Sequence, residues 1–495
     1  MSKGALLDLK PARSGYDPQP GAALGPWLQP LVVLVAGISV SAAVWFDQWL
    51  YFALGVVGLT FSVIILQRPY FGLLLWIFAF PLLDPYIRVD LPSGIPDITL
   101  NRVITGLTVL FLSLEVMLRR RQLLPPAKAE RSMVVLSAIM LGDMYMRSAS
   151  RGEDSLLIFD EYMGPFLLYV CFKNLVASGT DVRKALVALA MAALYLAPHG
   201  AFQFITHSEL PFWRGPAESV HSLVEEQGRA RGPFTDSVSY GALGNMVFLA
   251  ALYCYGWCRD LRGRLLYGAL VVGGGTVVLL CMTRSVWLGL AAALALSAWR
   301  EPRLRKTALA IVLGGVLGVS AIYLFFTDNA ESVSERAGDY ETVYIRIGLY
   351  NAALTMISEQ PLIGYGRHAV DVFYFNRNKY VSEIFGIAAE WGTLAGPPHN
   401  SLLYMSMMYG VFATLVYVSI FVYLIRNFLA LRRVRAPTLL PPGAYGSFML
   451  GMSVIYISVG MFTDVMSFDF FGKLYFFMSG GAAGLLHRYG TSNST

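Results

Sequence analysis

Three arginines stand at the ends of apolar runs, where they could hold an anionic group at a membrane surface. Arg229 and Arg231 precede a Gly-Pro turn in GRARGPFTDSVSYG, and Arg284 separates two apolar runs in CMTRSVWLGL. A guanidinium is a planar fork of donors that can hold two phosphate oxygens at once. Structural alternatives exist for each: Arg284 could snorkel to lipid headgroups, and the other two could lie in a solvated loop end.

A second group of candidates lies in and directly after a long polar interval, residues 327–397. Arg346, in YIRIGLYNAALT, could face a cavity or cap the polar face of a surface helix. His399 follows two prolines and opens an apolar run together with Asn400. Histidine titrates near neutral pH and is the commonest general base, and Asn400 could orient it or the substrate. The alternative for His399 is a helix-start histidine satisfied by backbone groups.

Two adjacent carboxylates, Asp160 and Glu161, begin another apolar run. Neighbouring residues of a helix point about 100° apart, so this pair does not suit paired acid–base work. One of them could hold an arginine, and the alternative is a structural ion pair. The sequence shows no metal constellation, P-loop or dinucleotide fingerprint, so no metal or cofactor is expected. It shows no basic, aromatic-interleaved patch for nucleic acid.

The composition places these residues in a membrane protein. Hydrophobic residues make up 56% of the 495 residues and charged residues only 14%, whereas soluble domains carry roughly a quarter charged residues. Apolar runs of membrane-spanning length predict an all-α polytopic protein with about 12–14 transmembrane helices. The expected spans cover residues 27–46, 49–66, 69–84, 98–118, 132–147, 155–177, 184–205, 237–257, 265–283, 285–299, 305–326, 398–425, 443–464 and 468–486.

The basic residues of the short loops give the expected orientation. With a cytoplasmic N-terminus they all fall on the inner side: Arg119, Arg120, Arg121, Lys128, Arg131, Arg183, Lys184, Arg259, Arg262, Arg264, Arg300, Arg303, Arg305, Lys306, Arg426, Arg432, Arg433 and Arg435. The tails at 1–26 and 487–495 are then cytoplasmic, and the loops at 206–236 and 327–397 are periplasmic. Ionisable residues inside spans would lie in the outer half, which favours a polar cavity open to the periplasm.

The large loop itself should contain a surface helix. Residues 340–359 carry one apolar stripe of Ile345, Leu349, Ala352 and Met356, as an amphipathic helix requires. The turn PLIGYG follows, and its glycines permit tight backbone geometry.

In order, these motifs resemble the bacterial O-antigen ligase and O-antigen polymerase superfamily. The motifs are R-x-x-G-x-F from Arg229, T-R-S around Arg284, R-x-x-x-Y-x-x-A-L from Arg346 with PLIGYG after it, and H-N at His399. The resemblance covers about residues 200–425. The number of spans exceeds the roughly twelve usual in ligases, which favours a polymerase.

This resemblance implies a GT-C-like glycosyltransferase of the bacterial inner membrane. It would take a glycan from an undecaprenyl-pyrophosphate carrier on the periplasmic face and transfer it, with inversion and without metal, to a glycan or lipid-linked acceptor. By motif, Arg229 and Arg284 would hold the pyrophosphate with Arg346 assisting, and His399 would activate the acceptor hydroxyl. A chain-length regulator is a possible partner.

Three other functions remain open. A ligase would transfer the glycan to lipid A core instead. A flippase or transporter of a lipid-linked glycan would need charged groups in both membrane halves, and the inner halves look bare. A scaffold or accessory subunit of an export complex would leave the arginines within apolar segments unexplained.

Overall fold

The computed structural model describes most of the chain after its first 67 residues. The described residues are 68–83, 88–89, 98–147, 151–206, 208, 229–234, 236–325, 341–366, 369, 373, 398–434, 440–465 and 468–490. The expected spans at 27–46 and 49–66 and the tail at 1–26 lie outside them, as do most of the loops at 206–236 and 327–397.

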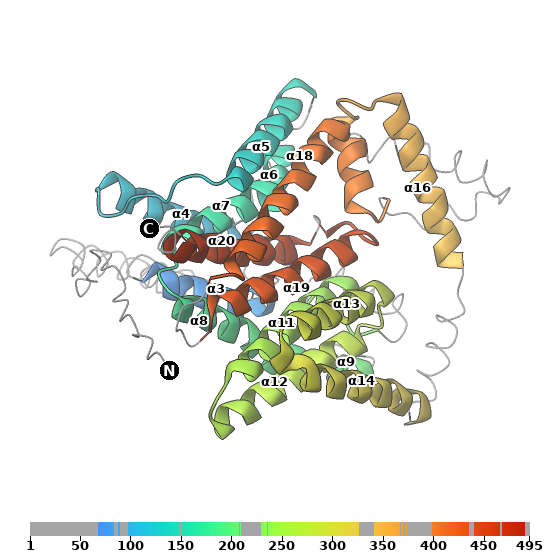
Figure 1. Ribbon diagram of the computed structural model, residues 1–495. Helices are drawn as coiled ribbons and strands as arrows, with labels where there is room; N and C mark the ends of the chain where they lie inside the picture. Colours follow the sequence, from blue (N-terminus) through green and yellow to red (C-terminus); the bar gives the residue numbers. More distant parts are fainter. Residues whose placement is uncertain are drawn as a thin grey trace, which may run out of the picture. The chain divides into compact units, whose positions relative to one another are not determined.

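The described part of the chain is almost wholly helical, which confirms the expected all-α membrane fold (Figure 1). A ribbon of two-residue strands, β1 (Arg88–Val89) and β2 (Ile98–Thr99), is antiparallel. The helices are α3 (Pro69–Leu83), α4 (Leu100–Met117), α5 (Lys128–Arg147), α6 (Arg151–Ile158), the π-helix η1 (Phe159–Met163), α7 (Gly164–Leu175), α8 (Gly179–Met191), α9 (Ala193–Thr206), α11 (Ser237–Trp257), α12 (Leu261–Leu280), α13 (Arg284–Arg300), the 3₁₀-helix η2 (Pro302–Leu304), α14 (Arg305–Phe325), α16 (Glu341–Glu359), α18 (Ser401–Leu431), α19 (Pro442–Gly460) and α20 (Asp469–Gly490).

Six helical segments among the described residues are long and apolar enough to cross a membrane. They are Ser155–Leu175, Gly179–Thr206, Ser237–Trp257, Leu261–Leu280, Ser401–Leu431 and Pro442–Gly460. Capping residues fix the starts of two of these helices: α11 begins at Ser237, as expected, and α12 begins at Leu261, four residues before the expected span. Asp236 Oδ1 accepts a hydrogen bond from the Ser239 amide at 2.7 Å, and Asp260 Oδ2 accepts one from the Gly263 amide at 2.7 Å. Each thereby satisfies an otherwise unpaired amide in the first turn.

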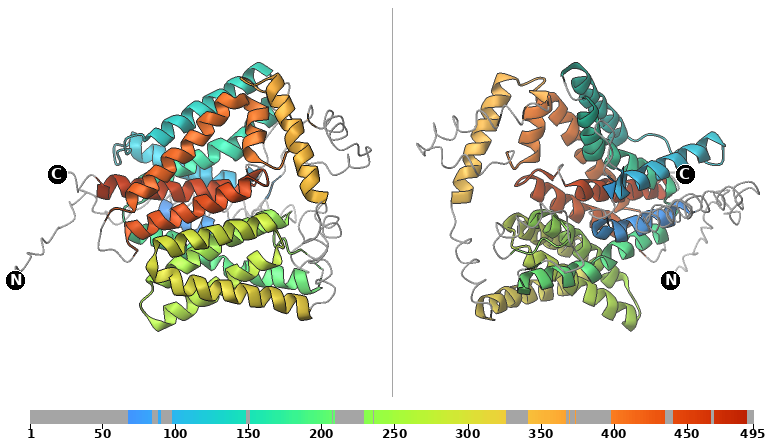
Figure 2. Two further views of the ribbon diagram at one scale, coloured as in Figure 1. Left: turned by 45° about the vertical axis from the view of Figure 1, so that its right-hand side comes forward. Right: turned by 180° about the vertical axis from the view of Figure 1, so that it is seen from behind.

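Helix α19 lies at the centre of the packing, since it contacts α11, α13, α18 and α20. Views from two sides show α13 running alongside it (Figure 2). A Cβ atom added at Gly289 of α13 would lie 3.5 Å from Ser458 Cβ, and one added at Gly451 of α19 would lie 3.5 Å from Ser297 Oγ. The start of α13 therefore lies beside the end of α19, so the two helices are antiparallel.

Helices α7 and α20 approach each other at backbone distance. Gly480 and Gly484 of α20 lie against the carbonyl oxygens of Tyr169 and Lys173, and a Cβ at either glycine would overlap them. Two small residues four positions apart are the usual means of bringing membrane helices this close. The pair therefore fixes α7, and with it the preceding π-helix, against the C-terminal helix.

Helix α18 is broken at Gly410, and the PLIGYG turn fills the break. Gly410 has φ +81° and ψ 169°, which interrupts the helical hydrogen bonds around it. The turn replaces two of them: the Tyr365 amide donates to the Met407 carbonyl at 2.9 Å, and the Val411 amide donates to the Pro361 carbonyl at 2.8 Å. Unpaired backbone groups are costly in a membrane, so the break and the turn require each other.

The turn itself depends on glycine, as the sequence predicted. Gly364 and Gly366 have φ values of +59° and +65°. A Cβ at Gly364 would lie 2.6 Å from the Met407 and Met408 carbonyl oxygens. From the other side, Arg147 of α5 donates from Nη1 to the Gly364 carbonyl at 2.7 Å. The turn is thus clamped between α18 and α5.

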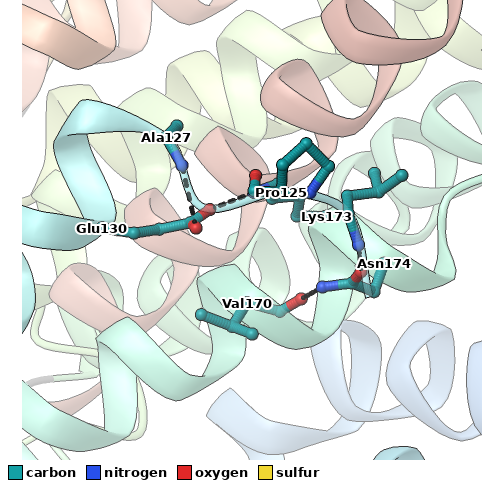
Figure 3. Close-up of polar contacts among 7 residues, drawn as sticks. Pro125, Ala127, Glu130, Val170, Lys173 and Asn174 are labelled. Atoms are coloured by element: carbon teal, nitrogen blue, oxygen red, sulfur yellow. Dashed lines mark hydrogen bonds and ion pairs between the residues drawn. The ribbon is translucent and has the colours of Figure 1, made fainter. Parts of the chain in front are cut away.

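The C-terminal end of α7, expected on the inner side, carries a buried ion pair with Glu130 of α5. This pair holds the loop between α4 and α5 (Figure 3). Lys173 Nζ donates to Glu130 Oε1 at 2.5 Å and to the Pro125 carbonyl at 2.7 Å. Glu130 Oε2 accepts from the Ala127 amide at 3.1 Å. Next to it, Asn174 Nδ2 donates to the Val170 carbonyl at 2.8 Å. Lys173 lies inside an expected span, and the sequence analysis did not single it out.

Replacing Gly410 by alanine should destabilise the protein. The new methyl would overlap the Leu362 carbonyl, and the φ and ψ of Gly410 lie in a region essentially restricted to glycine, where another residue costs about 1–3 kcal/mol. We expect a clear fall in the unfolding temperature in detergent. Gly106→Ala is the matched control, because a Cβ at this α4 position meets nothing within 4 Å; it should be neutral or stabilising. Equal behaviour of the two variants would contradict the structure of the α18 break.

Removing only one partner of the Lys173–Glu130 pair should also destabilise the protein. In Lys173→Met the Glu130 carboxylate stays largely buried without its cation, a change that costs about 3–5 kcal/mol in soluble proteins. Lys173→Met/Glu130→Gln should regain much of the loss, because no charge is then left buried. Thermal unfolding of both variants checks this. A double variant at least as unstable as the single one would show that the pair is not what holds the loop.

Candidate active site

The helix expected at 340–359 is present as α16, which begins at Glu341. Three residues of its predicted apolar stripe are buried, with Leu349 3%, Ala352 0% and Met356 1% exposed; the side chain of Ile345 lies outside the described part. The helix packs on α18 beside the N-terminal part of that helix (Figure 1). The apolar stripe therefore orients α16 and leaves Arg346 half-buried on it.

The carbonyl of Met461, at the end of α19, joins three elements. It accepts a hydrogen bond from the Tyr350 hydroxyl of α16 at 3.1 Å and one from Asn400 Nδ2 at 3.2 Å. Next to it, Ser401 Oγ donates to the Thr463 carbonyl at 3.2 Å. We call Arg346, Tyr350, His399, Asn400 and the Met461 carbonyl the His399 site.

Asn400 has a structural role at this junction. Its Oδ1 accepts from the Leu402 and Leu403 amides at 3.0 and 3.1 Å, and so caps α18. Its Nδ2 reaches Met461. The amide group is thus occupied with backbone partners, and Asn400 positions its neighbour His399 through the chain.

His399 has a backbone conformation that is uncommon for its residue type, with φ +39°. A non-glycine residue in the left-handed region is held there by its surroundings and occurs often at functional sites. Here Pro398 before it and the capped helix after it supply the constraint. The imidazole is half-buried at the start of α18, outside the membrane-spanning segment.

Burial and the nearby Arg346 cation together lower the pKa of His399 below its ordinary value. Burial penalises the charged imidazolium, and a neighbouring positive charge penalises it further. The lower pKa favours the neutral imidazole, which is the state a general base needs. The structure thus brings two predicted site residues, Arg346 and His399, close enough to interact electrostatically.

Arg284 lies at the same end of the helices. It is the first residue of α13, and α13 begins beside the end of α19, where Met461 lies. The preceding turn is held by Trp287, whose Nε1 donates to the Val278 carbonyl at 2.7 Å. The Arg284 side chain is exposed. Arg284 therefore lies at the protein surface at this end of the helices and not in the interior.

The loop with Arg229 and Arg231 is bound to the C-terminal end of α12, which shortly precedes Arg284 in the chain. The Ala230 amide donates to the Leu280 carbonyl at 3.0 Å, close in sequence to Arg284. Gln203 of α9 holds the next turn: its Oε1 accepts from the Arg231 and Gly232 amides at 3.1 and 2.7 Å.

The two arginines of this loop differ in burial. Arg229 is half-buried, whereas Arg231 is 1% exposed. Arg231 therefore belongs to the protein interior and not to a solvated loop end.

Asp160 and Glu161 lie on η1, whose wider turn interrupts the expected span at 155–177. Asp160 holds an arginine, as predicted: Arg102 donates to Asp160 Oδ2 from Nη2 at 2.5 Å and from Nε at 3.0 Å. Lys473 lies 3.7 Å from its other oxygen. With two cations, Asp160 fits the structural alternative. Glu161 and Asp464 both lie close enough to Tyr162 to interact with it electrostatically. Asp464 follows Met461 by three residues, after the end of α19.

Sequence reasoning missed Gln203, Tyr350 and Arg147 as positioning residues. Tyr350 stood inside the R-x-x-x-Y motif, one turn from Arg346, which was a usable signal. Gln203 was an isolated amide in an apolar run, and such residues usually have a buried partner. Arg147 gave no signal, because its acceptor is a backbone carbonyl 217 positions away.

Comparison with protein families finds a match over the part of the chain that contains most of these residues. Residues 242–418 match the family described as O-antigen ligase. We call this matched segment the O-antigen ligase domain. This domain runs from α11 into α18 and contains Arg284, Arg346, His399 and Asn400, whereas Arg229 lies outside it. A comparison with curated proteins finds no match.

The O-antigen ligase domain confirms the resemblance to the O-antigen ligase and polymerase superfamily. Together with the apolar helices, it identifies a bacterial membrane enzyme with a ligase- or polymerase-type glycosyltransferase activity.

Arg346→Gln should raise the pKa of His399 toward its ordinary value, because a neighbouring cation is removed. Histidine-selective NMR titration in detergent micelles would measure the shift. Arg284→Gln is the control, since Arg284 is exposed and Arg346 is the arginine that acts on His399. An unchanged His399 pKa in Arg346→Gln, or the same shift in both variants, would contradict the arrangement of the site.

Proposed function

We propose that the protein is a polysaccharide polymerase of the O-antigen type. It transfers a glycan from an undecaprenyl-pyrophosphate carrier to a sugar hydroxyl of the acceptor on the periplasmic face of the inner membrane. The observation that carries the proposal is the half-buried His399, whose pKa is lowered by burial and by the Arg346 cation, inside the segment that matches the O-antigen ligase family. The proposed transfer needs a base to take the proton of the acceptor hydroxyl and a cation to stabilise the leaving pyrophosphate.

In the proposed step a ring nitrogen of His399 takes the proton of the acceptor hydroxyl. The hydroxyl oxygen forms a bond to the anomeric carbon while the bond from that carbon to the pyrophosphate oxygen breaks. The leaving pyrophosphate keeps the electron pair and remains on its lipid. A single displacement inverts the anomeric carbon. Because negative charge grows on the leaving group, fixed cations near it lower the barrier.

The arginines of the site differ in how exposed their side chains are, and we assign their roles accordingly. Arg346 and Arg229 are half-buried and Arg284 is exposed, so all three are accessible to a pyrophosphate at this end of the helices. We assign them to the leaving group. Arg231 is buried, and we assign it to supporting the loop that presents Arg229. The arginines supply the positive charge, so the proposal includes no metal ion.

The family's description favours a second candidate, a ligase that transfers the glycan to lipid A core. The same base and the same cations would serve that reaction, because the donor and the bond that breaks are unchanged. Only the acceptor differs. Purified protein incubated with carrier-linked glycan and either acceptor separates the two: polymer on the carrier supports the polymerase, and glycan on lipid A core supports the ligase.

His399→Ala should reduce product formation by a factor of about 10²–10⁴, the usual contribution of a general base. The assay is transfer from carrier-linked glycan by protein in proteoliposomes without a gradient and with EDTA present. Arg303→Gln is the control variant; its exposed arginine lies after the far end of α13 and should keep full activity.

Two outcomes would overturn the proposal. Retained activity in correctly inserted His399→Ala would eliminate the assigned base. If the wild-type protein forms no product with any acceptor but moves carrier-linked glycan across the bilayer, it is a transporter.

A further inference from the structure

A second basic site lies at the ends of α13 and α18 that are opposite to Arg284 and His399. Arg300 ends α13, and Arg432 and Arg433 follow α18. Together with Leu429 they line a cavity of about 330 Å³. A water molecule takes up roughly 30 Å³, so this space accommodates a phosphate group. Helix α13 has 17 residues, which separates the cavity from Arg284 by roughly 25 Å at the α-helical rise.

The cavity concentrates positive charge without an internal counter-ion. Among the residues that the structure describes, no ion pair joins any of these three guanidinium groups to a carboxylate. Arg300 Nε is buried and has no hydrogen-bond partner in the same part of the chain. The nearest carboxylate in sequence, Glu301, accepts a hydrogen bond from Ser447 Oγ at 2.6 Å. A buried donor without a partner indicates a ligand with acceptor oxygens.

The surroundings of the cavity favour a lipid over a free anion. Trp299 is 67% exposed and Leu429 is 37% exposed. The guanidinium carbon of Arg300 lies 4.2 Å from the centroid of the Trp299 ring. Exposed tryptophan next to arginine is typical of the boundary between hydrocarbon and headgroups. An acyl chain could therefore follow the apolar side while the headgroup enters the cavity.

We propose that the cavity lined by Arg300, Arg432 and Arg433 binds the phosphate headgroup of an anionic membrane lipid. Basic pockets between membrane helices on the cytoplasmic side bind such headgroups, and the positive-inside pattern puts these arginines on that side. The lipid would tie the end of α13 to the end of α18, which the cavity separates. This site is independent of the proposed transferase activity.

The test is retention of phosphatidylglycerol by purified protein, measured by native mass spectrometry from nanodiscs that contain phosphatidylglycerol and phosphatidylcholine. The variant Arg300→Gln/Arg432→Gln/Arg433→Gln should retain at least about tenfold less phosphatidylglycerol than the wild type, since each basic residue near an anionic surface contributes measurably. The control is Arg303→Gln/Lys306→Gln/Arg426→Gln. It removes the same charge from exposed positions on the same expected side, outside the cavity, and should retain lipid as the wild type does.

Specific outcomes would overturn this proposal. Equal loss in both triple variants would mean that net charge alone attracts the lipid, and no loss in the cavity variant would mean that the cavity is not the site. Displacement of the lipid by millimolar inorganic phosphate would show a phosphate site and not a lipid site. Should the triple variant unfold, Arg433→Gln alone, at an exposed position, must still weaken retention. Transferase activity is not the readout, so failure here leaves the proposed function standing.

Discussion

The break in α18 at Gly410 is the constraint on which the candidate site depends. A helix interrupted inside the membrane must have its freed backbone groups satisfied. Residues 361–366 do this by hydrogen bonds to Met407 and Val411. Because that turn directly follows α16, the repair of the break also holds α16 against α18. Arg346 is thereby brought to His399 from 53 positions away in the sequence.

The site is held by backbone acceptors more than by side-chain pairs. Tyr350 and Asn400 meet at one carbonyl of α19, and Gln203 holds two amides of the Arg231 loop. The charged pairs that do form, Asp160 with Arg102 and Glu130 with Lys173, lie within or beside the helix packing and serve stability.

The two ends of the protein carry positive charge for different purposes. At the His399 site the Arg346 cation lies near the imidazole and lowers its pKa, which is the condition that the proposed proton transfer requires. At the other end Arg300, Arg432 and Arg433 surround a cavity without a base, which suits binding but not chemistry. One pair of helices, α13 and α18, connects both ends, so the same scaffold can hold a reacting lipid and a structural lipid in opposite leaflets.

The sequence alone determined the helices, because apolar runs of membrane length and the caps at Asp236, Asp260 and Asn400 are local signals. It also determined α16, since the stripe of Leu349, Ala352 and Met356 has helical spacing. It could not show which helices meet. The Arg346–His399 contact, the burial of Arg231 and the exposure of Arg284 follow from helix ends brought together by α19 and by the α18 break. Those positions depend on backbone contacts between segments far apart in the chain. The order of residue types does not show which distant segments come close together.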